Sequence, residues 1–204
     1  EWKASLETGD APAPPAGPPQ AREELTRRTA HYRIWFSKTG PAAYLSQLEL
    51  ASVLERALRR SGLKPSFSAG FHPMPLITFG WALPVGVESR EEWFALFLRE
   101  QALPQTVAEK LGAALPEGLK ILRADPLGMG KKVAQPVGEE FLLTHHLPPA
   151  ETARRLDEWR AFLAAEHFPW YSVTKRGART MDIRPLVTSL SERAPSGLAL
   201  VFSW

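Results

Sequence analysis

Cationic side chains in two segments are the residues of this sequence best suited to chemistry, because arginine binds phosphate through paired hydrogen bonds. One segment is a predicted helix after residue 46, and the other is residues 175–185, where cations surround one carboxylate. The candidate phosphate-binding residues are Lys38, Arg56, Arg59, Arg60, Arg176, Arg179, Asp182 and Arg184. We expect Asp182 to orient an arginine at such a surface. A structural pair of Asp182 with Arg179 or Arg184 is the alternative.

A stiff loop follows the first cationic segment. In Gly70-Phe71-His72-Pro73-Met74-Pro75, two prolines fix φ and one glycine permits an otherwise strained turn. This composition indicates a loop that holds a shape, so we expect Phe71 to stack on a base and His72 to assist by hydrogen bonding. His72 is also the candidate catalytic residue, as a general acid or base, if the chain is an enzyme. A structural turn with a packed His72 is the alternative.

No catalytic or metal-binding constellation accompanies these residues in the sequence. There is no cysteine, which excludes disulfides, zinc–thiolate sites, iron–sulfur ligation and cysteine nucleophiles. His145 and His146 are neighbours in a predicted strand, so their side chains point to opposite faces and do not make a metal-ligand pair. We therefore expect no metal and no cofactor in this chain.

Composition bounds the class of protein. With 204 residues, of which 44% are hydrophobic, the chain is long enough for a substantial core. It has no apolar run of membrane-spanning length and no secretory signal peptide, so we expect a cytoplasmic protein without a membrane partner. The formal net charge is only +3. However, residues 31–80 contain six Lys or Arg and two Glu, a local basic excess that favours an anionic partner.

The elements that position the first cationic segment have a βαββαβ order. Ser46 and Glu49 form a capping box, and Leu50, Leu54 and Leu58 follow at helical spacing. The predicted strands are residues 32–38, 64–68, 76–83, 93–98 and 119–123, and the predicted helices are residues 46–61 and 106–115. This order is typical of the ferredoxin-like arrangement.

The second half predicts a similar order that ends early. Its predicted strands are residues 141–145, 170–175, 181–187 and 198–204, and its predicted helix is residues 149–166. We therefore predict an α+β protein of tandem ferredoxin-like units, the second incomplete at the C-terminus. We expect residues 1–28 to form a disordered Pro/Ala-rich linker, residues 29–127 the first unit and residues 128–204 the second, with the joint near residues 126–138.

Several short motifs, in one order, resemble those of the radical SAM-associated domain of unknown function, which occurs alone or fused C-terminal to a cobalamin-binding radical SAM module. The motifs are Phe36-Ser37-Lys38-Thr39-Gly40, Leu45-Ser46-Gln47-Leu48-Glu49-Leu50, Glu55-Arg56-Ala57-Leu58-Arg59-Arg60, Gly70-Phe71-His72-Pro73, Pro84-Val85-Gly86-Val87-Glu88 and Asp182-Ile183-Arg184-Pro185. The chain departs from the family at Glu49, where Asp is frequent, and at Leu76, where a basic residue is frequent.

The resemblance implies a radical SAM enzyme as partner, in cis or in trans, and that partner uses S-adenosylmethionine and an iron–sulfur cluster. Together with the basic helix and the aromatic loop, it leads us to expect an accessory domain that binds nucleic acid, most plausibly RNA. A docking module for the radical SAM partner is one alternative. A stand-alone enzyme, in which His72 acts on a phosphate-bearing substrate held by Arg56, Arg60 and Arg184, is the other.

Overall fold

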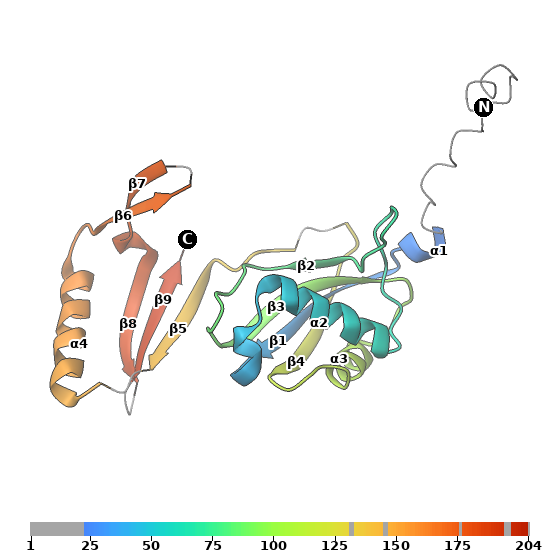
Figure 1. Cartoon of the computed structure of the whole chain (residues 1–204), viewed down its shortest axis with the longest axis horizontal. Helices are drawn as coiled ribbons and strands as arrows, with labels where there is room; N and C mark the ends of the chain where they lie inside the picture. Colours follow the sequence, from blue (N-terminus) through green and yellow to red (C-terminus); the bar gives the residue numbers. More distant parts are fainter. Residues whose placement is uncertain (1–22, 131–132, 145–146, 176, 194–196, 204) are drawn as a thin grey trace, which may run out of the picture. The chain divides into compact units, whose positions relative to one another are not determined.

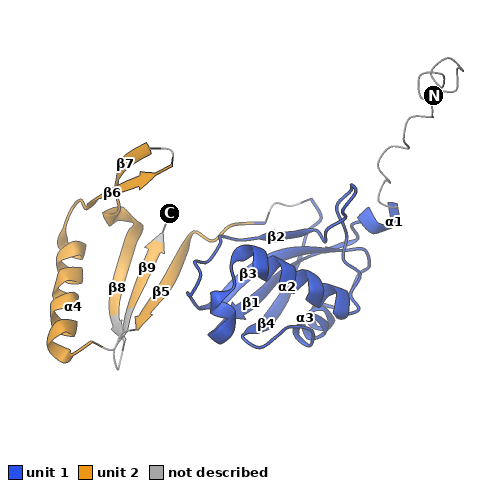
Figure 2. Cartoon of the chain, viewed as in Figure 1, with its two compact units in different colours: residues 1–133 blue, residues 134–204 orange. Residues whose placement is uncertain are grey.

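The computed structural model describes residues 23–130, 133–144, 147–175, 177–193 and 197–203. The chain divides into two compact units, Glu1–Val133 and Ala134–Trp204 (Figure 2). This division falls within the predicted joint at residues 126–138. Most of the predicted linker, residues 1–22, lies outside the described residues, and residues 23–26 are helical.

The first unit contains one four-stranded antiparallel sheet in the order β2-β3-β1-β4 (Figure 1). Its elements are α1 (Glu23–Thr26), β1 (Ala30–Lys38), η2 (Gly40–Tyr44), α2 (Gln47–Arg60), β2 (Ile77–Phe79), β3 (Ser89–Leu98), α3 (Pro104–Gly112) and β4 (Leu119–Leu127). Side chains of α2, α3 and one face of the sheet form a single core, whose fully buried members include Ile34, Leu54, Phe94, Leu96, Val107 and Leu111.

The helix α2 begins where its capping box predicts. The Ser46 Oγ accepts a hydrogen bond from the Glu49 amide at 3.4 Å, and the Glu49 carboxylate accepts one from the Ser46 amide at 2.8 Å. Leu50, Leu54 and Leu58 are all buried, so the predicted apolar stripe is the face that packs on the sheet. The predicted helix at residues 46–61 is therefore confirmed.

Two predicted strands of the first unit differ from the structure. Residues 64–68 make only two isolated bridges, Pro65 to Leu98 and Phe67 to Pro75, and form no strand. Proline has no amide to donate, so continuous pairing is interrupted at both bridges. The strand predicted over residues 76–83 is shorter, because only Ile77–Phe79 pairs with β3.

The second unit contains a three-stranded antiparallel sheet, β5-β9-β8, and a separate two-stranded sheet, β6-β7. Its elements are β5 (Gly138–Thr144), α4 (Pro149–Ala164), β6 (Pro169–Thr174), β7 (Gly177–Asp182), η3 (Arg184–Leu186), β8 (Val187–Arg193) and β9 (Gly197–Ser203). The predicted strand 181–187 is wrong, because β7 ends at Asp182 and the turn η3 separates it from β8.

The predicted mixed α+β class is confirmed in both units. In the parts of the chain that are described, the strands of the second unit are divided between two sheets, whereas those of the first unit form one. The arrangement of the second unit is therefore different from that of the first. None of the described helices is both long and apolar enough to cross a membrane.

Candidate nucleic-acid interface

The cations of α2 are partly engaged within the protein. Arg59 Nη2 lies 2.6 Å from Glu55 Oε1, one helical turn earlier, and Arg60 Nη2 donates to the carbonyl oxygen of Ala114 at 2.8 Å. Arg56 is exposed and has neither an ion pair nor a hydrogen bond to its side chain among the described residues. A surface pair such as Arg59–Glu55 is weak. The helix can therefore offer Arg56 and Arg59 to a phosphate, while Arg60 already has an acceptor.

The loop after α2 has a defined shape. The Ser68 amide donates to the Met74 carbonyl oxygen at 2.8 Å, and the Met74 amide donates to Ser68 Oγ at 3.1 Å. Gly70 has a φ of 131°, a conformation that a residue with a side chain rarely adopts. At the end of this closed loop the Phe71 ring is 62% exposed and therefore accessible for stacking.

His72 is exposed, and no hydrogen bond or ion pair fixes its ring within the part of the chain that is described. A catalytic histidine needs a neighbour that orients it and a place where a substrate atom can approach. Neither the predicted partners Arg56 and Arg60 nor another described side chain supplies that orientation. The geometry therefore supports contact by Phe71 more than catalysis by His72.

Lys38 lies inside the first unit. Its residue is only 2% exposed, and its Nζ donates a hydrogen bond to the Ala43 carbonyl oxygen at 3.0 Å. Burial lowers the pKa of its ammonium, an effect that attraction to Glu92 partly opposes. A phosphate bound at the surface does not reach this position.

On the face of the first sheet opposite α2 and α3, Arg123 is paired with carboxylates. The Arg123 guanidinium lies 4.3 Å from the centre of the Trp35 ring, and it also forms ion pairs with Glu91 at 2.6 Å and Asp125 at 3.3 Å. The Trp35 indole donates to Asp125 Oδ2 at 2.6 Å. This network satisfies its own charges, so it is a weaker candidate for a polyanion site than a cluster without carboxylates.

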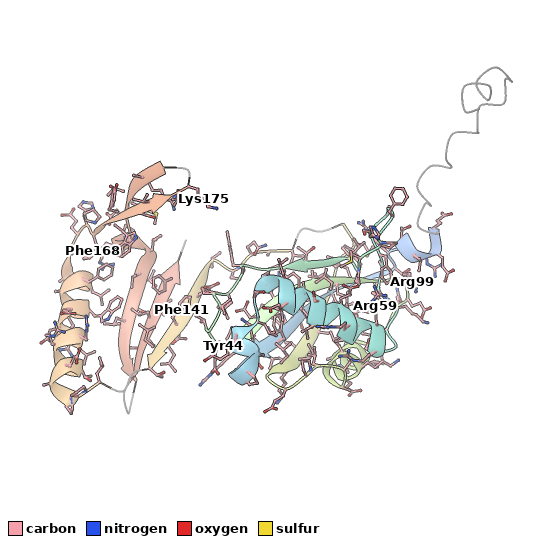
Figure 3. All side chains as sticks on the ribbon, viewed as in Figure 1. Tyr44, Arg59, Arg99, Phe141, Phe168 and Lys175 are labelled. Atoms are coloured by element: carbon pink, nitrogen blue, oxygen red, sulfur yellow. The ribbon has the colours of Figure 1, made fainter. Side chains whose placement is uncertain are left out.

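The strands β6 and β7 form a two-stranded ribbon that pairs with no other described strand. Trp170 is 55% exposed and Tyr171 is 65% exposed, and because they are consecutive in a strand their rings lie on opposite faces of the ribbon. Figure 3 places Lys175 where β6 ends. Lys175 and Arg179 are both exposed, and residues 169–181 contain no Asp or Glu. The ribbon thus combines aromatic and cationic side chains with little internal compensation.

Asp182, the last residue of β7, fixes the end of the ribbon where β6 begins and β7 ends, which we call its base. Its Oδ1 accepts hydrogen bonds from the amides of Phe168 at 2.8 Å and Arg184 at 3.1 Å, and its Oδ2 lies 2.7 Å from His167 Nδ1. The bond from the Phe168 amide, followed by the contact with His167, lowers the pKa of the Asp182 carboxyl. Asp182 therefore contacts Arg184 through the backbone amide, not through the guanidinium.

The Arg184 guanidinium fastens the turn after the ribbon to α4. Its Nε and Nη2 donate to the Leu163 carbonyl oxygen at 3.1 and 2.7 Å, and its Nη1 donates to the Val187 carbonyl oxygen at 2.9 Å. The carbonyl groups of the last helical turn receive no hydrogen bond from an amide of the helix, and an arginine side chain commonly donates to them instead. Phe168 lies at the base of the ribbon (Figure 3). The centre of its ring is 4.9 Å from the centre of the Phe162 ring in α4.

The structure thus separates the predicted cations into different groups. Arg56, Arg59 and Arg179 lie at the surface, whereas the buried Lys38 and the half-buried Arg184 donate to carbonyl oxygens of the protein. Arg176, His145 and His146 lie outside the described residues. Among the residues that the structure describes, no group of three or more His, Asp or Glu is placed to hold a metal ion.

Sequence reasoning missed Trp170 and Tyr171 as candidate contacts, and it included Lys175 in the cationic segment 175–185 without naming it as a site residue. The signal was present, because two adjacent aromatic residues in a strand cannot both be buried when only one face is covered. The absence of carboxylates from residues 169–181 was a second signal. The cations around Asp182 instead favoured a site centred on that carboxylate.

Fold and surface together define a two-unit α+β protein that presents a ribbon of aromatic and cationic residues. The chain belongs to the family DUF2344, uncharacterized proteins conserved in bacteria, which matches residues 31–203. All the motifs quoted from the sequence lie within this matched range. No curated protein matches the chain.

Proposed function

We propose that this chain is an RNA-binding accessory domain and that the ribbon β6–β7 makes the central contact. The observation that carries the proposal is the joint exposure of Trp170 and Tyr171 beside Lys175 and Arg179, in a segment without carboxylates. Aromatic side chains that stack on bases contribute about 1–3 kcal/mol per base, and neighbouring cations attract the phosphates. Because paired bases do not expose their faces to such rings, the ligand is single-stranded.

The first unit supports the same role through separate residues. Phe71 is an exposed ring on a loop of fixed shape, and Arg56 is an exposed cation on α2. The βαββαβ order and the strand order β2-β3-β1-β4 favour a ferredoxin-like assignment for this unit, an arrangement that frequently serves RNA recognition. That likeness is an analogy of fold, and the exposed side chains carry more weight. The order of helices and strands in the second unit does not support a tandem repeat of this arrangement.

The sequence motifs are the only support for the part of the proposal that makes a radical SAM enzyme the partner of this chain. In this scheme the chain holds an RNA substrate in the cytoplasm while the partner, in cis or in trans, supplies S-adenosylmethionine and an iron–sulfur cluster. This chain supplies no cysteine for such a cluster. Its contribution is binding and positioning, not the radical step.

A docking module is the second candidate function, and one surface of the first unit favours it. Four exposed apolar side chains come from η2, the start of α2 and the loop after β2, and they are Tyr44, Leu48, Trp81 and Val85. The Gly86 amide donates to the Ala43 carbonyl oxygen at 2.9 Å, which holds the two segments together. Large exposed apolar patches commonly mark protein interfaces. Such a patch fits a protein partner and offers no cations to RNA.

Fluorescence-monitored titration with single-stranded RNA of mixed sequence tests the first candidate. The double variant Trp170→Ala, Tyr171→Ala is expected to bind at least about fivefold more weakly, the loss for one stacked base. Tyr44→Ala is the matched control, since it removes an exposed ring of the apolar patch and leaves the ribbon intact. Unchanged affinity in the ribbon variant, or equal loss in Tyr44→Ala, would refute a ribbon-centred site.

A further inference from the structure

The two faces of the ribbon β6–β7 differ in chemistry. Residues directly opposite each other in an antiparallel pair point to the same face, and successive residues of one strand point to opposite faces. Trp170 lies opposite Met181, and Ser172 lies opposite Arg179. These four residues therefore share one face of the ribbon, which we call the Trp170 face.

The Trp170 face offers a platform on which one base can stack. Trp170 is 55% exposed and Met181 is 39% exposed. Residues directly opposite each other have Cβ atoms about 4.5–5.5 Å apart, so these two side chains are neighbours. The indole consists of two fused rings, and a thioether makes favourable contacts with aromatic rings. The platform is therefore wider than a single six-membered ring.

Arg179 supplies a cation on the same face. It lies diagonally across the two strands from Trp170, and such diagonal neighbours are about 7–8 Å apart, within reach of a long side chain. Arg179 is exposed, and residues 169–181 contain no Asp or Glu that could neutralise it locally. A guanidinium in this position can bind the phosphate of a nucleotide whose base stacks on the indole.

The opposite face, which we call the Tyr171 face, has an aromatic ring without such a cation. Tyr171 lies opposite Thr180, and Val173 lies opposite Ala178. Of the residues in β6 and β7, the one charged residue on this face is Asp182, a carboxylate at the base of the ribbon. A base stacked on Tyr171 would therefore find no Lys or Arg of these two strands for its phosphate.

We propose that the ribbon binds one unpaired purine base of RNA on its Trp170 face, with the base stacked on the indole and its phosphate bound by Arg179. This assignment rests on the RNA-binding function proposed above, to which it adds the class of base and the face of the ribbon. A purine has two fused rings, so it covers the indole and the thioether more fully than a pyrimidine does. Differences in stacking strength are a source of base preference in single strands.

Binding of two labelled RNA hexamers to the full chain, followed by fluorescence anisotropy, tests the proposal. In one hexamer C alternates with A, and in the other C alternates with U, so the two have the same charge and neither pairs with itself. We expect the hexamer with A to bind at least about threefold more tightly, which is part of the contribution of one stacked base. Trp170→Ala should abolish this preference. Tyr171→Ala is the matched control, because it removes an exposed ring from the other face, and it should retain the preference.

A second variant and the double variant make the result decisive. Trp170→Phe keeps one six-membered ring in the ribbon and should bind both hexamers with a smaller preference for A. Equal affinity of the native chain for the two hexamers, together with weaker binding by the double variant Trp170→Ala, Tyr171→Ala, would overturn the purine assignment and leave the RNA-binding function in place. A preference that is lost in Tyr171→Ala and retained in Trp170→Ala would overturn the assignment to the Trp170 face. RNA binding that none of these variants changes would overturn both the assignment and the ribbon-centred function.

Discussion

The guanidinium of Arg184 donates two hydrogen bonds to a single acceptor, the carbonyl oxygen of Leu163, and thereby joins the turn after β7 to the last turn of α4. Arg184→Lys is expected to lower the free energy of unfolding by about 1–3 kcal/mol, because an ammonium cannot reproduce these bonds together with the one to Val187. Thermal and urea unfolding of the full chain measure the change. Arg179→Lys, at an exposed position of the ribbon, is the control and should have little effect.

The hydrogen bonds of Asp182 predict a pH dependence at the base of the ribbon. They lower the carboxyl pKa in the folded state below the ordinary value of 3.8. Their contribution to stability is therefore fully present above about pH 4 and is lost as the pH falls through the folded-state pKa. The stability difference between the native chain and Asp182→Asn should be larger at pH 5 than at any pH below about 4. A difference that stays constant down to pH 2 would contradict this assignment.

Salt dependence distinguishes phosphate contacts from stacking on the ribbon. The double variant Lys175→Gln, Arg179→Gln should reduce the slope of log affinity against log salt by about 0.7 for each lost contact with single-stranded RNA. Trp170→Ala should weaken binding without changing this slope. Lys110→Gln, which removes an exposed cation from α3, is the matched control and should leave both quantities unchanged. Equal slopes in all variants would argue against phosphate contacts at the ribbon.

The loop after α2 gives a prediction that distinguishes binding from catalysis. Phe71→Ala should leave stability nearly unchanged, since the ring is 62% exposed, and should reduce RNA affinity about fivefold if one base stacks there. His72→Gln should change neither quantity substantially. If His72→Gln abolished the activity of the proposed radical SAM partner while folding and RNA binding were retained, a catalytic role for His72 would replace the present interpretation.

The capping box of α2 predicts a measurable stability loss. Ser46→Ala removes both the hydroxyl that accepts from the Glu49 amide and the hydroxyl donor to its carboxylate. The expected cost is about 1 kcal/mol. Ser52→Ala is the control, because the Ser52 hydroxyl bonds to the Leu48 carbonyl oxygen inside the helix and contributes little there. Urea unfolding of the two variants should separate them clearly.

Local signals were sufficient to predict α2, because the cap residues Ser46 and Glu49 lie three positions apart and the apolar stripe lies within the same helix. The roles of Lys38 and Arg184 were not accessible in this way. Lys38 is a charged residue whose burial depends on packing between β1, η2 and α2. Arg184 bonds to Leu163, 21 residues earlier in the chain, and no short spacing encodes that contact. A cation that serves a helix end is indistinguishable in sequence from one that serves a ligand.

The separate ribbon has a consequence for affinity. A two-stranded sheet alone is only marginally stable in water, and here its ordered form depends on the anchor formed by Asp182 and Arg184. If only a fraction of molecules hold the ribbon in its binding conformation, the measured dissociation constant rises in inverse proportion to that fraction. Substitutions at the anchor would thus weaken RNA binding without removing a contact with RNA, and RNA would in turn protect the amides of β6 and β7 from hydrogen exchange. The affinity for RNA and the order of β6 and β7 then depend on the same conformational equilibrium of the ribbon.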